Sequence, residues 1–318
     1  MSLSPLPLKS TRLAGLSERL MQSHHQNNYG GAVKRLNAIR AQLATLDFNT
    51  TPGFTLNGLK REELLATHSM LLHELYFASL GGDGQIPAPM AVALAASFGS
   101  AQRWRDEFIA IGRALGGGSG WVLLGYLPRE GRLVNQWAAD RSHAVALGTP
   151  VLALDMYEYA YHLDHGANAA AYVDAFMANV DWTGVALRYA QAVHAASDGL
   201  GANHDAVVAS ALLLDVRRAG VFANADTLLP GASWRDPADI ATWMPALPKD
   251  REIVVYCVYG HEVGQGTTLR LRAEGYNARF LEGGIDAWAA KGRPLQAKAQ
   301  RVSAPSCERV DGVGPEQR

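Results

Sequence analysis

Two histidines and an aspartate occur at positions from which they could bind one metal ion. His24 and His73 lie on the first two predicted helices, and Asp155 ends an apolar run that predicts a β-strand. Two imidazoles and a carboxylate are ligand types of mononuclear iron and manganese sites. Tyr159 is about one helical turn beyond Asp155, so the two side chains should share a face. The spacing makes these four residues candidates for a metal centre.

A cysteine marks a second candidate site. Cys257 directly follows the apolar run 252–256 and precedes a predicted helix. A thiol at such a strand-to-helix turn faces backbone N–H groups and the positive end of the helix dipole. We expect both to lower the pKa of the thiol and to bind anions. A buried structural cysteine is the alternative that position alone leaves open.

The first site must be positioned by helices and a small sheet. Apolar residues at helical spacing predict helices over 12–47 and 59–80, joined by a loop rich in Asn, Thr, Pro and Gly. The runs GWVLLGYL and RLVNQWAA, separated by PREG, predict a β-hairpin, and TPVLALD predicts a third strand. Two further predicted helices follow. This order indicates an α+β domain over 1–195.

The second site belongs to a different kind of domain. The apolar runs LLLDVRR, EIVVYC and NARFLEGG alternate with helical segments such as GTTLRLRAEG and IDAWAAKG. Such alternation indicates an α/β domain with a parallel sheet, which we place at 206–298. The polar segment 196–205 is the predicted linker. Residues 299–318 have little apolar content and are predicted to be disordered.

Composition narrows the range of partners and compartments. Hydrophobic residues make up 48% of the 318 residues, which is enough for one or two ordinary cores. A net charge of −1 without a long basic run argues against a nucleic-acid partner. No apolar stretch is long enough to span a bilayer, and the first residues lack the apolar core of a secretory signal. Because two cysteines cannot build a disulfide framework, we expect a cytoplasmic protein.

Five segments of the first domain resemble, in order, the iron/manganese superoxide dismutases: HHQNNYGGAVKRLN (24–37), HELYFASLGG (73–82), GSGWVLLGY (118–126), LDMYEYAYHLDH (154–165) and VDWTGVALRYA (180–190). The resemblance implies a long helical hairpin beside a small antiparallel sheet, one iron or manganese ion per chain, and superoxide or another small oxidant as substrate. It also implies a homodimer, in which Glu158 reaches across the interface. Trp121 matches an aromatic residue near the site.

The resemblance places the metal ligands on His24, His73 and Asp155, with Tyr159 where the family has a fourth histidine. A phenolate ligand is anionic and would favour the oxidised metal. His162, seven residues after Asp155, returns to the same helical face and is an alternative fourth ligand. Surface exposure of His162 is the competing interpretation.

Other positions around the implied site also depart from the family pattern. The family's gateway tyrosine and histidine, the tryptophan beside the second ligand, and the glutamine that hydrogen-bonds the metal-bound solvent are all replaced. The residues found at these places are Ala32, Asn28, Phe77 and, at the two possible places of the glutamine, Ser69 and Asp140. Three outcomes therefore stay open: a working dismutase, a metal protein with other redox chemistry, and a metal-free scaffold.

Three segments of the second domain are similar to rhodanese domains: LLLDVRR (212–218), VVYCVYGHEV (254–263) and FLEGGIDAW (280–288). The resemblance implies that Cys257 carries a persulfide from a small sulfur donor, or that its loop holds an oxyanion. Gly260 and His261 would help to shape this loop. Asp215 and Arg217 would brace it.

Glu262 stands where rhodanese domains often have an arginine, and its carboxylate would repel an anionic donor such as thiosulfate. Taken together, the two resemblances favour a dismutase-like metal enzyme fused to a sulfurtransferase, acting in oxidative or oxyanion stress. The alternative is a dimerising scaffold, with or without metal, in which only Cys257 is chemically active.

Overall fold

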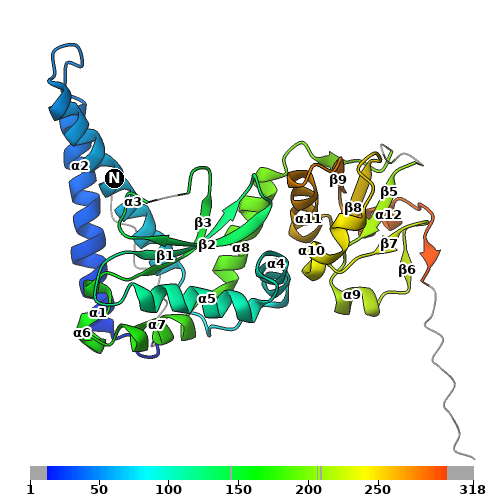
Figure 1. The fold of residues 1–318 in the computed structure, drawn as a ribbon, viewed down its shortest axis with the longest axis horizontal. Helices are drawn as coiled ribbons and strands as arrows, with labels where there is room; N and C mark the ends of the chain where they lie inside the picture. The colour runs from blue at the N-terminus through cyan, green and yellow to red at the C-terminus, as the bar shows by residue number, and fades with distance from the viewer. Residues whose placement is uncertain (1–12, 144, 206, 208–209, 299–318) are drawn as a thin grey trace, which may run out of the picture.

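The computed structural model describes residues 13–143, 145–205, 207 and 210–298. It has two lobes side by side (Figure 1). The larger N-terminal lobe ends with α8 (Trp182–Ala196), and the smaller C-terminal lobe begins near β4 (Gly201–Ala202). This arrangement agrees with the two predicted domains in kind and order. The tail 299–318, predicted to be disordered, lies outside the described residues.

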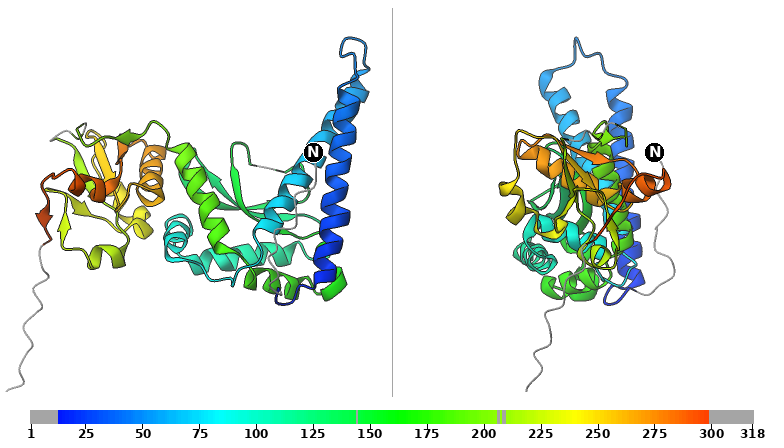
Figure 2. Two further views of the ribbon diagram at one scale, coloured as in Figure 1. Left: turned by 180° about the vertical axis from the view of Figure 1, so that it is seen from behind. Right: turned by 90° about the vertical axis from the view of Figure 1, so that its right-hand side faces the viewer.

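A long helical hairpin opens the N-terminal lobe and extends beyond the rest of it (Figures 1 and 2). Its first arm is continuous through α1 (Glu18–Ser23), a π-helix (His24–Tyr29) and α2 (Gly30–Leu43), and its second arm is α3 (Gly53–Ala78). The predicted start of the second arm at residue 59 was wrong. The carbonyl of Pro52 already accepts hydrogen bonds from the N–H groups of Thr55 and Leu56, so the helix begins inside the predicted loop.

The predicted hairpin and third strand are confirmed as an antiparallel sheet. The central strand β1 (Trp121–Leu127) pairs with β2 (Arg132–Ala138) on one side and with β3 (Thr149–Asp155) on the other. Helix α3 packs against β3, while α5 (Ala101–Ala114) and α8 pack against β1. Both faces of β1 are therefore covered, and six of its seven residues are buried.

The other helices of this lobe surround the sheet. They are α4 (Ala88–Phe98), α5 (Ala101–Ala114), a 3₁₀ turn (Glu158–Ala160), α6 (His162–His165), α7 (Ala169–Ala178) and α8 (Trp182–Ala196). A left-handed Gly99 (φ 89°) ends α4, and the Ser100 hydroxyl caps α5 by accepting the Arg103 N–H at 3.0 Å. Among the described residues, no helix combines the length and the apolarity that crossing a membrane requires.

The C-terminal lobe is built on the predicted parallel sheet, with strand order β4-β9-β8-β5-β7. Its strands are β4 (Gly201–Ala202), β5 (Leu212–Asp215), β7 (Ser233–Trp234), β8 (Ile253–Tyr256) and β9 (Ala278–Leu281), and β6 (Thr227–Leu228) pairs separately with β10 (Gln296–Ala297). Its helices are α9 (Ala219–Ala223), α10 (Ile240–Trp243), α11 (Glu262–Ala273) and α12 (Gly284–Ala290), with 3₁₀ turns at Pro237–Asp239 and Met244–Ala246. Strand β4 falls within 196–205, so this segment contributes an edge strand as well as a connection.

The two lobes contact each other through α11, which packs on α8, and through α4, which packs beside the 3₁₀ turn Pro237–Asp239. The Arg270 guanidinium donates to the carbonyl of Glu130 at 3.1 Å, and the side chains of Gln265 and His194 lie 3.4 Å apart. Gly131 (φ 61°) allows the β1–β2 turn to approach the α11 backbone closely. Because α11 directly follows the Cys257 loop, the N-terminal lobe supports the helix that borders this loop.

Candidate metal centre and cysteine loop

His24, His73 and Asp155 meet in the interior of the N-terminal lobe. Asp155 Oδ2 lies 3.1 Å from His24 Nε2 and 3.5 Å from His73 Nε2, and none of the three side chains is exposed. Among the described residues, this is the one group of three or more His, Cys, Asp or Glu side chains arranged to hold a metal ion. The structure thus brings together residues that are up to 131 positions apart in the sequence.

Local structure aims each of these side chains at the others. His24 begins the π-helix, an irregularity that often occurs at functional sites. His73 Nδ1 lies 2.6 Å from the Ser69 carbonyl oxygen, which fixes the proton on Nδ1 and leaves the Nε2 lone pair free. The Tyr157 N–H donates to Asp155 Oδ1 at 3.0 Å, which leaves Oδ2 for the cluster.

The donor set fits an iron or manganese ion. Burial lowers the pKa of His73 to about 4, against the opposing effect of the Asp155 charge, so its imidazole is neutral at pH 7 as a ligand must be. Donor atoms bound to one first-row ion at about 2.1 Å lie roughly 3–3.5 Å apart. The separations of 3.1 and 3.5 Å from Asp155 Oδ2 agree with this spacing.

Tyr159 lies at the edge of this cluster. Its phenol oxygen is 3.4 Å from His73 Nε2 and accepts a hydrogen bond from Arg141 Nη2 at 2.6 Å. Burial raises the pKa of the phenol and the Asp155 charge raises it further, whereas Arg141 opposes both effects. The alternative fourth ligand, His162, is exposed on α6 and does not belong to the metal-binding group found among the described residues.

Cys257 follows β8 in the C-terminal lobe, and its side chain faces the backbone of the loop that precedes α11. Backbone N–H groups of Tyr259, Gly260, His261 and Gly264 hydrogen-bond to its sulfur and lower the pKa of the thiol. Burial has the larger, opposite effect, so the net pKa is raised. The predicted lowering was therefore wrong, because the loop position does not reveal that Cys257 is 7% exposed.

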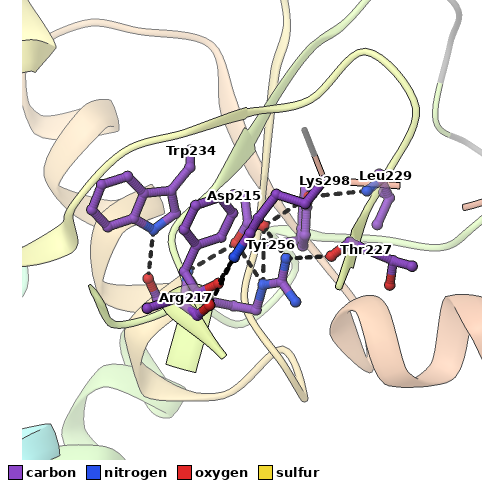
Figure 3. Close-up of polar contacts among 9 residues, drawn as sticks. Asp215, Arg217, Thr227, Leu229, Trp234, Tyr256 and Lys298 are labelled. Carbon is purple, nitrogen blue, oxygen red and sulfur yellow. Dashed lines mark hydrogen bonds and ion pairs between the residues drawn. The ribbon is translucent and has the colours of Figure 1, made fainter. Parts of the chain in front are cut away.

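Asp215 and Arg217 form a buried ion pair beside the strand that leads to Cys257 (Figure 3). Arg217 Nη2 donates to Asp215 Oδ2 at 2.6 Å and to the Thr227 carbonyl at 2.8 Å. The Tyr256 hydroxyl donates to the same carboxylate oxygen at 3.1 Å. Tyr256 directly precedes Cys257, so the pair fixes the end of β8 from which the loop departs.

Comparison with known proteins identifies a family for each lobe. Residues 87–188 match the family model described as iron/manganese superoxide dismutases, C-terminal domain, and residues 197–291 match the rhodanese-like domain. A "Superoxide dismutase [Fe]" of Cupriavidus metallidurans is 63% identical over 191 residues, which are 60% of this chain and 97% of the relative. The chain belongs to the iron/manganese superoxide dismutase family. It carries, in addition, a rhodanese-like domain.

More distant dismutases cover the same part of the chain. "Superoxide dismutase [Mn] 2" of Haloferax volcanii is 32% identical over 202 residues, covering 60% of this chain and 96% of the relative. "Superoxide dismutase [Fe]" of Aquifex pyrophilus is 31% identical over 196 residues, covering 59% and 91%. Some of these relatives are named for iron and others for manganese. The metal expected from the family is therefore iron or manganese.

Trp121, which matches the dismutase pattern, and three residues that depart from it, Phe77, Ala32 and Asn28, have distinct surroundings. The Trp121 ring stands perpendicular to His73 with centroids 5.3 Å apart, and the Phe77 ring lies 5.1 Å from that of His24. Ala32 is buried and Asn28 is half-buried on the first arm of the hairpin. Trp121 and Phe77 thus form an apolar wall around the two histidines.

Two other predicted residues lie outside the cluster. Asp140 Oδ1 accepts hydrogen bonds from the N–H and the hydroxyl of Ser142, so its carboxylate is used within its own turn. Glu158 is exposed, next to Tyr159.

Glu262 and His261 begin α11 but differ in their surroundings. Glu262 lines a small cavity between the lobes, of about 40 Å³, together with Tyr189 and Arg270. His261 is exposed, and its ring lies 5.8 Å from that of Tyr259. The carboxylate that replaces the usual arginine therefore takes part in the contact between lobes. Gly260 (φ 73°) is needed where it stands, because a Cβ would lie 2.7 Å from the Leu281 carbonyl oxygen.

Three residues near the metal centre were not predicted. Arg141 contacts Tyr159, the Arg141 guanidinium carbon lies 4.1 Å from the centre of the Tyr157 ring, and His68 Nδ1 lies 2.6 Å from the Arg141 carbonyl oxygen. Arg141 belongs to an irregular segment, where periodicity carries no information. The sequence offered one chemical indication of Arg141. If Tyr159 stands where the family has a neutral histidine ligand, its phenolate would add a negative charge, and a nearby cation would be needed to balance it.

Proposed function

We propose that the N-terminal lobe is a working superoxide dismutase that holds one iron or manganese ion between His24, His73 and Asp155. The observation that carries this proposal is the convergence of His24 Nε2, His73 Nε2 and Asp155 Oδ2 at ligand spacing in a fully buried site. Metal-binding for other redox chemistry and a metal-free scaffold are the competing functions.

The ligands and the aromatic residues around them have different roles in this proposed site. A bound iron or manganese ion would supply the alternating one-electron oxidation and reduction by which two superoxide anions and two protons become dioxygen and hydrogen peroxide. His24 and His73 contribute neutral donors, and Asp155 contributes one negative charge. Trp121 and Phe77 exclude water and keep the local dielectric low, which strengthens the electrostatic interactions inside the site.

Elemental analysis and superoxide decay together test this proposal. The purified full-length protein should contain about one equivalent of iron or manganese and should accelerate superoxide decay. His73→Gln should lose most of the metal and the activity, whereas His162→Gln, a control on an exposed histidine, should retain both. Bound metal without superoxide consumption would favour other redox chemistry. If the protein binds neither metal in the presence of saturating iron or manganese salts, the metal-free scaffold is the function that remains.

We further propose that Cys257 is a persulfide carrier. Three backbone N–H groups of the loop (Tyr259, Gly260 and His261) and one from the first turn of α11 (Gly264) hydrogen-bond to its sulfur, which is the arrangement needed to stabilise the negative charge of a thiolate or a persulfide. The donor attacked by Cys257 must therefore be small enough to reach a side chain that is 7% exposed. An oxyanion bound by the same N–H groups is the second ligand that this loop suits.

Mass spectrometry after incubation with thiosulfate or inorganic polysulfide tests this assignment. Cys257 should gain the mass of one sulfur atom and should release it to cyanide, and Cys257→Ser should do neither. His73→Gln should leave the sulfur transfer unchanged, since the metal centre is in the other lobe. A Cys257 that stays unmodified by both donors would contradict the proposal.

The full proposal is a cytoplasmic homodimer, joined through the N-terminal lobe and acting in oxidative or oxyanion stress. The exposed Glu158 beside Tyr159 supports the dimer, because it is free to pair with a second subunit. The paucity of cysteines supports a reducing compartment. Light scattering at micromolar concentration should give the mass of two chains, and a monomer would contradict the dimer.

A further inference from the structure

Arg141 is the centre of a contact network that connects Tyr159 to the rest of the site. Its guanidinium donates to the Tyr159 oxygen at 2.6 Å and lies 4.1 Å from the centre of the Tyr157 ring. The Tyr157 and Tyr159 rings stack with centroids 5.3 Å apart. On the other side, His68 Nδ1 lies 2.6 Å from the Arg141 carbonyl oxygen. The backbone and the guanidinium of Arg141 are therefore each held by a named partner.

The direction of the Arg141 hydrogen bond decides what the Tyr159 oxygen can do. An arginine only donates, so the phenol oxygen uses one lone pair to accept it. The same oxygen lies 3.4 Å from His73 Nε2. The proton of this imidazole is on the other ring nitrogen, Nδ1, which contacts the Ser69 carbonyl. The other lone pair and the proton of the Tyr159 hydroxyl therefore face His73. This is the side on which the metal centre lies, so the oxygen is placed to bind an ion there.

Charge gives Arg141 a second effect. Asp155 contributes one negative charge, and a tyrosine oxygen that binds a metal contributes another, whereas a histidine in the same place contributes none. The added negative charge stabilises the oxidised ion and lowers its reduction potential. A guanidinium within hydrogen-bond distance of the same oxygen offsets this change. Arginine suits the role because its planar group can donate and stack at once.

We propose that Arg141 is the positioning residue of this centre, which holds the Tyr159 oxygen as the fourth protein ligand and offsets the negative charge that this ligand adds. The inference rests on the proposed function, because it needs a metal ion held by His24, His73 and Asp155. It goes beyond that function by assigning a role to a residue that touches neither the three other ligands nor the ion.

Spectroscopy of the iron-loaded full-length protein tests the inference independently of activity. The ferric wild type should show a visible tyrosine-to-iron charge-transfer band, which Tyr159→Phe removes. Arg141→Gln should shift this band to longer wavelength and should lower the reduction potential, because the oxygen loses a donor and a nearby positive charge. Arg141→Lys should keep the potential closer to that of the wild type. Arg113→Gln, at an exposed ion pair with Asp174, should change neither.

Four results would overturn the inference. A ferric wild type without the band would show that Tyr159 is not a ligand, although dismutation could still stand. An unchanged band and potential in Arg141→Gln would show that Arg141 does not act on the ligand. Equal shifts in Arg113→Gln would show a nonspecific charge effect. A wild type that binds no iron or manganese would remove the proposed dismutase function together with this inference.

Discussion

Removal of Arg217 should destabilise the C-terminal lobe strongly, because it would leave the Asp215 carboxylate buried without its cation. The side chains are 5% and 0% exposed and are joined by three hydrogen bonds of 2.6–3.0 Å. Breaking a buried ion pair from one side costs about 3–5 kcal/mol. Since a domain is stable by roughly 5–15 kcal/mol, Arg217→Met should lose a large fraction of the stability of this lobe.

Native-state hydrogen exchange is the suitable assay, because a two-lobe chain need not unfold in one step. The free energy of opening at the amides of β5 and β8 should fall by about 3–5 kcal/mol in Arg217→Met. The combined variant Asp215→Leu/Arg217→Met should lose less, since no unpaired charge remains.

Arg113→Met, at an ion pair whose side chains are 50% and 58% exposed, is the control and should change stability by no more than about 1 kcal/mol. The reasoning would be refuted if Arg217→Met cost as little as this control, or if the combined variant lost more than the single one.

Three further predictions concern the cysteine loop and the contact between the lobes. Because burial raises the pKa of Cys257, the thiolate forms only at higher pH, so alkylation by iodoacetamide should reach half its maximal rate above about pH 8.5, the ordinary value for cysteine; a midpoint near neutrality would contradict this. Gly260→Ala should cost about 1–3 kcal/mol and prevent sulfur loading, whereas Gly220→Ala, with open space around its Cβ, should preserve loading. Gly131→Ala should loosen the lobes and raise proteolysis near 197–200, because its Cβ would lie 2.6 Å from the Arg270 nitrogen. Gly117→Ala, at a similar φ but without a neighbour, should not raise proteolysis, and equal cleavage in both variants would sink the argument.

Much of the fold could be predicted, because its strands and helices have strong local patterns. The run GWVLLGYL, followed by PREG, specifies a β-hairpin by apolar content and turn residues alone, and the structure has β1 and β2 there. Prediction failed where the pattern is weak. The first residues of α3 (53–58) include Gly, Thr and Asn, whose content predicts a loop, and β4 is too short to be recognised before its partner β9 is known.

The candidate sites could be predicted only in part. The type of each residue can be read directly from the sequence, whereas its burial and its charged neighbours depend on the fold. The types of His24, His73 and Asp155 suggested a metal, and their order matched a family. That Cys257 is buried, and that its pKa is therefore raised, depends on packing by residues remote in the sequence. The same holds for Glu262, whose carboxylate lines the cavity between the lobes.

Tyr159 and Arg141 together explain how this centre could depart from the family pattern without losing a metal. A tyrosine in place of the fourth histidine brings an anionic donor into a site that already contains Asp155, and a buried excess of negative charge is costly unless a cation compensates it. Arg141 supplies that cation at 2.6 Å from the new oxygen. If Arg141 acts only through the Tyr159 oxygen, the reduction potential of the double variant Arg141→Gln/Tyr159→Phe should differ from the sum of the two single effects and should be close to that of Tyr159→Phe alone. Additive effects of Arg141→Gln and Tyr159→Phe on the reduction potential would mean that the two residues influence the ion separately.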